Sequence, residues 1–201
     1  MIKNKANILN LFPTTIYYSR HLEIDNKSLE KHILEISKNN ISSENTNIGG
    51  EQYYFNNNDT NLSFQNLKKV ILREVNNYAE EINLKTPLKL QNIWANINGY
   101  KDFNNPHIHS QSLVSGVYYV KVPKNGGDLK FLHPKYELLG YDWQPRNIKK
   151  FEIANSSEWC FYPKNNIMFL FPNWATHEVT PNLNKKEKRI SISFNFWSAN
   201  D

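Results

Sequence analysis

The chain has 201 residues, 39% of them hydrophobic and 21% charged, which suffices for the packed core of about one domain and excludes a globally disordered protein. No stretch approaches the ~20 apolar residues of a membrane span, we see no signal peptide, and the single Cys160 excludes a disulfide framework and a cysteine-based zinc site, so we expect a cytoplasmic protein. The net charge of +5 is a mild excess whose densest run, 185–189, is typical of a solvated hairpin loop, with a nucleic-acid or acidic partner as the alternative.

The N-terminal part of the chain alternates strand-like and helix-like patterns. Residues 11–18 are rich in β-branched and aromatic side chains and predict an early strand. Apolar residues at three- and four-residue spacing predict helices over 26–38, with Asn26 as its cap, and over 61–83. The polar segment 40–61 between them is rich in turn residues and predicts a loop.

After residue 87 the chain changes to short apolar and aromatic runs separated by turn residues. These runs predict about eight strands, over 88–98, 108–122, 128–132, 150–153, 158–162, 166–171, 175–180 and 188–197. The segment 123–127, PKNGG, is a hairpin-like turn signal. We therefore expect one α+β, mainly β domain over 1–201, in which the helices of an extension over 1–87 pack on one sheet of a β-sandwich or jelly roll over 88–201.

Three histidines in this second part are candidates for a metal site. His107 and His109 lie at i and i+2 near a predicted strand, where side chains point to the same face and can reach one point. Jelly-roll closure would bring His177, near another strand start, beside this pair. Three neutral imidazoles suit Fe, Zn, Cu or Ni and leave coordination positions open. The alternative is that the spacing of His107 and His109 arose by chance and that His177 is a core histidine without a ligand.

The segment 188–197, KRISISFNFW, alternates polar and apolar residues. Arg189 lies on its polar face, and an inward-facing arginine would be a buried cation that needs an anionic partner. The guanidinium fork matches a carboxylate through two parallel hydrogen bonds. An ordinary basic residue that closes the lysine-rich loop is the alternative interpretation.

The order of short motifs along the chain is more specific than any one of them. The motifs are LFPT at 11–14, WxN at 94–96, HxH at 107–109, SGVYY at 115–119, GG at 126–127, FPxWxxHxVxP at 171–181 and RxSxSFN at 189–195. In this order the sequence resembles the iron(II)- and 2-oxoglutarate-dependent oxygenases, and within them a 2OG-Fe(II) oxygenase group of bacteria and phages. The resemblance covers nearly the whole chain and implies a double-stranded β-helix, which is a jelly roll.

The resemblance implies that His107, His109 and His177 bind iron and act as the catalytic centre. Most members of the superfamily have a carboxylate as the middle ligand, whereas this chain has His109, as the smaller group also tends to have. Asp128, after the Gly-Gly turn, is the alternative carboxylate.

The resemblance also implies a site for 2-oxoglutarate. In it, Arg189 pairs with the distal carboxylate, Tyr119 hydrogen-bonds the same carboxylate, and Ser191 adds a hydroxyl. Asn96 and Asn195 line the cosubstrate pocket or, alternatively, satisfy backbone groups. The implied enzyme is a dioxygenase that uses Fe(II), 2-oxoglutarate and O2 to hydroxylate an unidentified substrate, with release of succinate and CO2.

Three other classes of protein stay open. The first is a three-histidine, cupin-like metalloenzyme that does not use 2-oxoglutarate, and a buried carboxylate clamp at Arg189 would argue against it. The second is a non-catalytic binding module of the same fold. The third is a nucleic-acid-binding protein with 185–189 as its footprint. The helical part could also form a homodimer, and no membrane partner is expected.

Overall fold

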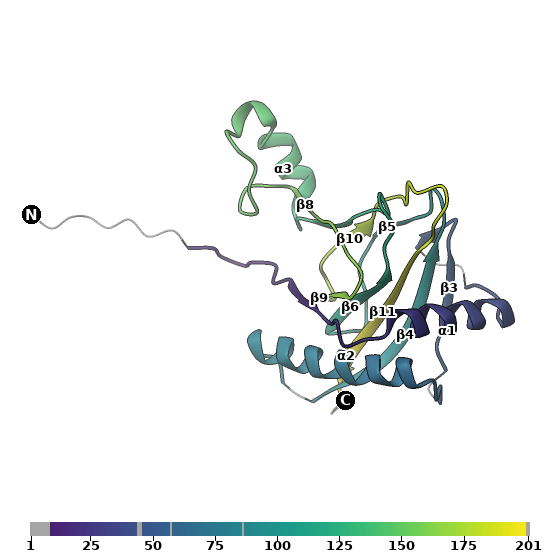
Figure 1. Cartoon of the computed structure of the whole chain (residues 1–201). Helices are drawn as coiled ribbons and strands as arrows, with labels where there is room; N and C mark the ends of the chain where they lie inside the picture. Colours follow the sequence, from purple (N-terminus) through teal and green to yellow (C-terminus); the bar gives the residue numbers. More distant parts are fainter. Residues whose placement is uncertain (1–8, 44–45, 57, 86, 200–201) are drawn as a thin grey trace, which may run out of the picture.

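Two antiparallel sheets packed face to face make up the computed structural model, which describes residues 9–43, 46–56, 58–85 and 87–199 (Figure 1). The larger sheet runs in the order β1 (Tyr17–Arg20), β9 (Ile167–Pro172), β6 (Val114–Lys121), β11 (Arg189–Ser198), β4 (Leu88–Asn98) and β3 (Glu51–Tyr54). The smaller sheet runs in the order β2 (Asn47–Ile48), β5 (Phe103–His107), β10 (His177–Val179), β7 (Leu129–Leu132) and β8 (Glu158–Phe161). The helices are α1 (Asn26–Asn39), α2 (Leu62–Glu81), α3 (Tyr136–Asp142) and the short 3-10 helix η1 (Pro145–Asn147).

The long pair β4 and β11 at the centre of the larger sheet explains how the alternating sequence positions the site. Ile190, Ile192 and Phe194 point to one face and are fully buried in the core beneath the helices. The polar residues between them point to the other face, toward the smaller sheet. Because side chains alternate along a strand, β11 has one apolar face that packs in the core and one polar face that is turned toward the smaller sheet.

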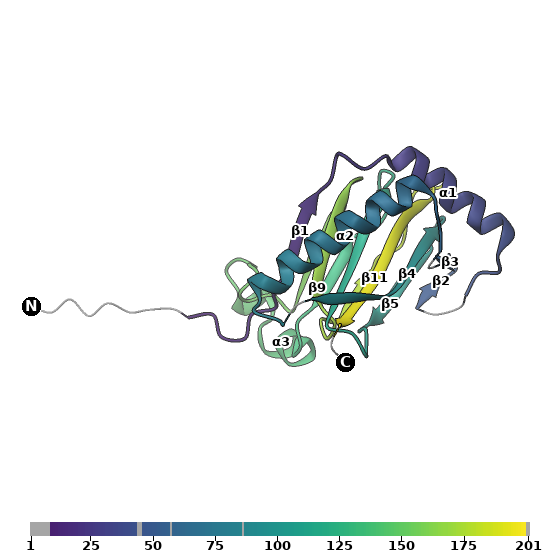
Figure 2. The same cartoon turned by 90° about the horizontal axis from the view of Figure 1, so that it is seen from below.

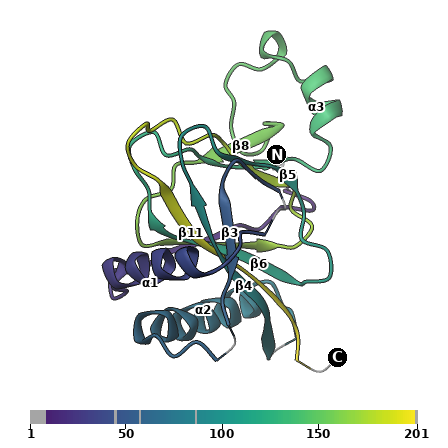
Figure 3. The ribbon, with the colours of Figure 1, turned by 90° about the vertical axis from the view of Figure 1, so that its right-hand side faces the viewer.

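Helices α1 and α2 cover the outer face of the larger sheet, as the sequence predicted (Figure 2). Leu29 and Ile33 of α1 and Phe64 of α2 are completely buried there, and Phe64 stacks on Phe55 with ring centroids 4.0 Å apart. Figure 3 shows both helices on one side of the sheets, whereas α3 projects from the other side.

The N-cap of α1 differs from the prediction. Asp25, and not Asn26, caps the helix, because its carboxylate accepts hydrogen bonds from the backbone N–H groups of Lys27 and Ser28. Asn26 is the first helical residue and its amide donates to the carbonyl of Val120, 2.7 Å away, which joins α1 to β6. The helix over 61–83 is confirmed as α2, and Asn61 caps it through the N–H of Phe64.

Several predicted strand boundaries were wrong, and pairing partners explain why. Residues 11–16 are not a strand, because pairing with β9 begins only at Tyr17. The predicted loop over 40–61 contains β2 and β3, whose polar residues carry no apolar alternation and are fixed by pairing with β5 and β4. Residues 150–153 are not a strand but part of the segment with α3 and η1 that leaves the sheets (Figure 1).

Two connections around the site also differ from the prediction. The strand expected over 108–122 begins only at Val114, as β6, and the preceding strand β5, which was not predicted, ends at His107. The turn at 123–127 exists, with Gly126 N–H bonded to the carbonyl of Pro123, but it joins β6 to β7 in the opposite sheet and so is not a hairpin. No helix in the described ranges has the length and hydropathy that crossing a membrane requires.

Candidate metal and cosubstrate site

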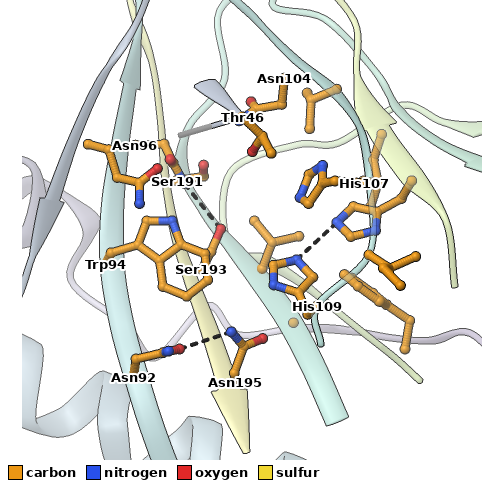
Figure 4. A pocket seen from close by; sticks show the side chains of 18 of the residues that line it. Thr46, Asn92, Trp94, Asn96, Asn104, His107, His109, Ser191, Ser193 and Asn195 are labelled. Atoms are coloured by element: carbon orange, nitrogen blue, oxygen red, sulfur yellow. Dashed lines mark hydrogen bonds between the residues drawn. The ribbon is translucent and has the colours of Figure 1, made fainter. Parts of the chain in front are cut away.

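A cavity of about 280 Å³ lies between the two sheets, at the polar face of β4 and β11. The larger sheet contributes its polar side chains to one wall, and the ends of β5 and β10 contribute imidazoles to the other (Figure 4). Apolar residues of the inter-sheet core, among them Val117, Leu129 and Phe171, close the cavity on the inside.

The fold brings the three predicted histidines together. β5 pairs with β10 so that His107 lies directly opposite His177, and His109 follows two residues after His107. One ring nitrogen from each of the three lies within 4.8 Å of the other two, and Nε2 of His109 is 3.3 Å from Nε2 of His177. No carboxylate belongs to this group in the described part of the chain, and Asp128, the alternative ligand, is not a member of it.

Backbone carbonyls fix the protonation of two of the imidazoles. Nδ1 of His107 donates to the carbonyl of Asn105, 2.7 Å away, and Nδ1 of His177 donates to that of Ala175, 2.9 Å away. Because a carbonyl only accepts, each Nδ1 carries the proton and each Nε2 keeps its lone pair when the ring is neutral. Hydrogen bonds of this kind orient histidines that bind metals.

Burial keeps all three rings neutral. It lowers the pKa of His107 and His177, that of His177 strongly, and together with the charge of His107 it lowers the pKa of His109 to about 4. At neutral pH no proton therefore competes with a metal ion for the ring nitrogens.

Arg189 lies at the start of β11 and is one of the most buried side chains of the protein, with 1% of its surface exposed. Its Nη1 donates to the carbonyls of Gly126, 2.6 Å away, and Thr180, 3.1 Å away. Its Nη2 is buried and has no hydrogen-bond partner in the described structure. Burial lowers the pKa of the guanidinium, which is the cost expected for a charge that lacks an anionic partner.

Tyr119 adds a second unpaired donor to the same region. It lies on β6 opposite Ser191, and the charge of Arg189 acts on it. Its hydroxyl is buried without a partner among the described residues, and burial raises its pKa to about 12, so it stays protonated. Two buried donors without acceptors are rare in a folded protein and indicate a missing ligand with acceptor oxygens.

The other predicted cosubstrate residues are spread along the strands. Ser191 and Asn96 are paired neighbours on β11 and β4, close to Arg189 in the register. Asn195 lies further along β11, where it hydrogen-bonds Ser115 and Asn92. The structure thus places all of them on the cavity wall, but at different distances along it.

Sequence reasoning missed part of this wall. Asn92 and Ser193 belong to it and could have been found from the alternation that identified their neighbours. Gln52 and Tyr54 also belong to it, but they lie in the segment that was predicted as a loop.

The family model described as "Putative 2OG-Fe(II) oxygenase" matches residues 92–195, which is more than half of the chain and includes all of the predicted metal and cosubstrate residues. The chain belongs to this family of 2OG-Fe(II) oxygenases. No curated protein matches the sequence.

Solved structures show the same fold at low sequence identity. A prolyl-4-hydroxylase from Pseudomonas putida is 13% identical, with 92% of this chain and 93% of that chain covered and a TM-score of 0.60. A prolyl hydroxylase from Trichoplax adhaerens, in complex with a hypoxia inducible factor peptide fragment, is also 13% identical, with 92% and 84% covered and a TM-score of 0.65. HygX from Streptomyces hygroscopicus, with nickel and 2-oxoglutarate bound, is 11% identical, with 92% and 84% covered and a TM-score of 0.62. The predicted jelly roll is confirmed.

The residues of this oxygenase fit both groups that its family uses. Three neutral imidazoles that converge on one point match a divalent iron. The buried, unpaired donors of Arg189 and Tyr119 match a carboxylate, which offers only acceptors. The cofactors of the chain are therefore Fe(II) and 2-oxoglutarate, as the resemblance implied.

Proposed function

We propose that His107, His109 and His177 hold the iron of this oxygenase, and that Arg189 and Tyr119, with Ser191 beside them, hold the distal carboxylate of 2-oxoglutarate. The single observation that carries the proposal is the pair of unpartnered donors, Arg189 Nη2 and Tyr119 Oη, buried in the wall of the cavity that the histidines also line. Bound iron and 2-oxoglutarate would supply the oxidising chemistry, in which decarboxylation to succinate and CO2 accompanies transfer of oxygen from O2 to the substrate.

The residues of the chain have three tasks in this reaction. Arg189, fixed by the carbonyls of Gly126 and Thr180, neutralises and orients one end of the cosubstrate. The carbonyls behind His107 and His177 keep the ring nitrogens aimed at the metal. The apolar side chains between the sheets exclude water from the reacting groups.

An anaerobic Fe(II) titration with and without 2-oxoglutarate tests the proposal. We expect the weak visible charge-transfer band of an iron-bound keto acid in the wild type. His177→Ala should remove the band, and Arg189→Ala should raise the 2-oxoglutarate concentration needed for it at least tenfold. His133→Ala and Arg146→Ala are matched controls, because both residues are exposed and lie outside the cavity.

Two results would contradict the proposal. Iron binding without a band would favour the three-histidine metalloprotein that does not use 2-oxoglutarate. A band that Arg189→Ala leaves at the wild-type concentration dependence would remove Arg189 from the cosubstrate site.

A further inference from the structure

The cavity wall extends well beyond the place of the cosubstrate. Arg189 and Asn195 share one face of β11 but are six residues apart, which corresponds to roughly 20 Å along a strand. His109 lies against Trp94 and Phe171, at ring-centroid distances of 5.9 and 6.4 Å. In the register Trp94 pairs with Ser193, and Phe171 is linked through Ser115 to Asn195. His109 therefore faces the part of the wall that Arg189 does not occupy.

This free part of the wall consists of amides, a hydroxyl and aromatic rings. Figure 4 shows Trp94, with Asn96 on one side and Asn92 and Asn195 on the other, across the cavity from the imidazoles of His107 and His109. Tyr54 of the neighbouring strand β3 extends the aromatic surface, with its ring 5.8 Å from that of Trp94. We refer to these residues, with Gln52 and Ser193, as the amide wall.

Some polar atoms of the amide wall have no hydrogen-bond partner within the described structure. Asn96 uses one atom of its amide on Ser193 Oγ, 3.1 Å away, and the other atom is buried without a partner in the described structure. Asn195 Nδ2 donates to Asn92 Oδ1, 2.9 Å away, and the half-buried Asn92 keeps its own amide N–H groups for solvent or a ligand. A buried polar atom without a partner is costly, so a ligand that pairs with it gains affinity and selectivity.

The cavity carries almost no charge apart from its metal and cosubstrate ends. Among the described residues that line it there is no Asp, Glu or Lys, and Arg189 is the only permanent cation, although the whole chain has a net charge of +5. A substrate carboxylate or ammonium group placed at the amide wall would lose its hydration and find no counter-ion. The wall therefore selects for an uncharged polar group.

The sheet topology argues against an extended peptide at this place. β4 is paired on both sides, with β11 and β3, and β5 is paired on both sides, with β10 and β2. Among the described residues, an added strand could pair only at the outer strands of the two sheets, β1, β3, β2 and β8, so recognition directly beside the histidines depends on side chains. The cavity of about 280 Å³ is smaller than the ~300–1,000 Å³ usual for ligand sites and has to hold the cosubstrate as well, so the part of a substrate that enters it is small.

We propose that the group this enzyme oxidises is a small, uncharged, hydroxyl-rich unit, a sugar or polyol, bound between the amide wall and the histidines. A hydroxyl both donates and accepts, which matches amides that present either function, and the C–H face of such a unit packs on the rings of Trp94 and Tyr54. The proposal rests on the proposed function only in treating the bound group as a substrate. It moves Asn195 from the cosubstrate to the substrate end of the cavity, and it places Asn96, which pairs with Ser191, at the boundary between the two.

Ligand-observed saturation-transfer NMR on the Zn(II)- and 2-oxoglutarate-loaded protein tests this without turnover. Five probes share a six-carbon, hydroxyl-bearing skeleton: glucose, methyl glucoside, sorbitol, glucosamine and glucuronate. N-acetylglycinamide is added as a neutral amide. We expect the neutral hydroxylated probes to bind at least tenfold more tightly than the charged ones. Binding of methyl glucoside but not glucose would indicate a sugar attached to a larger molecule, and the reverse a free sugar.

Two variants test where the probes bind and whether the charge preference of the site can be changed. Trp94→Ala should abolish probe binding, whereas Trp143→Ala, a tryptophan at the end of α3 outside the cavity, should leave it unchanged. Asn96→Asp places a carboxylate on the amide wall at nearly constant volume and should make glucosamine the preferred probe. The control Asn58→Asp, which changes an exposed asparagine, should not do so. Thermal melting establishes that each variant is folded.

Three outcomes would overturn the proposal: charged probes that bind as well as neutral ones, preference for the amide probe, or no binding of any hydroxylated probe. Binding of 2-oxoglutarate is measured in the same samples by its own NMR signals. Sugar binding without 2-oxoglutarate binding would refute the proposed function and leave the neutral specificity of the wall intact. The opposite result would refute only the specificity.

Discussion

Nε2 of His109 lies 3.3 Å from Nε2 of His177, although Nδ1 of His177 is already committed to the carbonyl of Ala175. The lone pair of His177 Nε2 therefore points at a second nitrogen, and only a proton on His109 or a metal ion between them satisfies both. Backbone carbonyls hold the rings of His107 and His177 in this arrangement. A preorganised site of this kind lowers the cost of ordering side chains when the metal binds.

Metal binding should therefore stabilise the folded protein. At a free Zn(II) concentration of about 1,000 times Kd, linkage predicts about 4 kcal/mol of added stability, which differential scanning fluorimetry detects as a raised Tm. His177→Ala should lose this increase almost completely, because a vacant position replaces the most buried ligand. His133→Ala, which removes an exposed histidine, should keep it. An equal Zn(II) effect in both variants would contradict the three-histidine site.

Gly127 should control the position of Arg189. Its φ of +91° lies in the region that favours glycine, and a Cβ added there would overlap both Thr180 O and Arg189 Nη1. Gly127→Ala should displace the guanidinium and raise the Kd for 2-oxoglutarate at least tenfold, while metal affinity changes little. Isothermal titration calorimetry with each ligand separates the two effects.

Gly140→Ala is the matched control for this substitution. Gly140 lies in α3 with nothing within 4 Å of an added Cβ, so 2-oxoglutarate affinity should not change. The helix should even gain about 0.5–1 kcal/mol from the substitution. A Gly127→Ala protein with normal 2-oxoglutarate affinity would show that binding of 2-oxoglutarate does not depend on the present position of the Arg189 guanidinium.

The strand pattern in the sequence assigned Arg189 to a polar face but left open whether that face points into the protein. The alternation of 188–197 put it on a polar face, and pairing of β11 with β4 and β6 then turned that face into the cavity. The same reasoning could not find β3, since Gln52 and Tyr54 carry no apolar alternation and become a strand only by pairing with β4. Long strands with a buried face are visible in sequence, and edge strands fixed by backbone pairing are not.

The histidines illustrate the same limit within the site. Their spacing predicted that His107 and His109 point to one place, but the carbonyls that fix their tautomers belong to residues such as Asn105 and Ala175, whose identity carries no signal. The predicted N-cap of α1 was wrong for a related reason. Asp25 and Asn26 are both good caps, and only the contact of Asn26 with Val120 decides between them.

Gly116 should be required for the packing of β6 against Phe194 of β11 and Leu170 of β9. It lies opposite Phe194 in the register, and an added Cβ would come within 2.5 Å of the Phe194 ring. Gly116→Ala should therefore destabilise the protein by about 1–3 kcal/mol. Phe194→Leu frees space at the same point, so the double variant should be more stable than the sum of the two single changes predicts. Urea unfolding of the four proteins measures this coupling, and strict additivity would refute the steric account.

Glu74 should make the protein sensitive to acid. Burial raises the pKa of this carboxyl on α2, but hydrogen bonds from Tyr17 Oη, 2.5 Å away, and Arg73 Nε, 2.7 Å away, outweigh it, so the folded pKa lies below the ordinary 4.5. Because the folded pKa is lowered, the stabilisation is complete above pH 4.5 and disappears as the pH falls through the folded value. Glu74→Gln should lower the free energy of unfolding by on the order of 1–3 kcal/mol at pH 7 and by progressively less below pH 4.5.

Urea midpoints from pH 7 to pH 3 measure this difference. Glu81→Gln, an exposed residue on the same helix, is the control and should behave like the wild type. A difference between wild type and Glu74→Gln that stays constant with pH would show that the charge of Glu74 does not stabilise the fold.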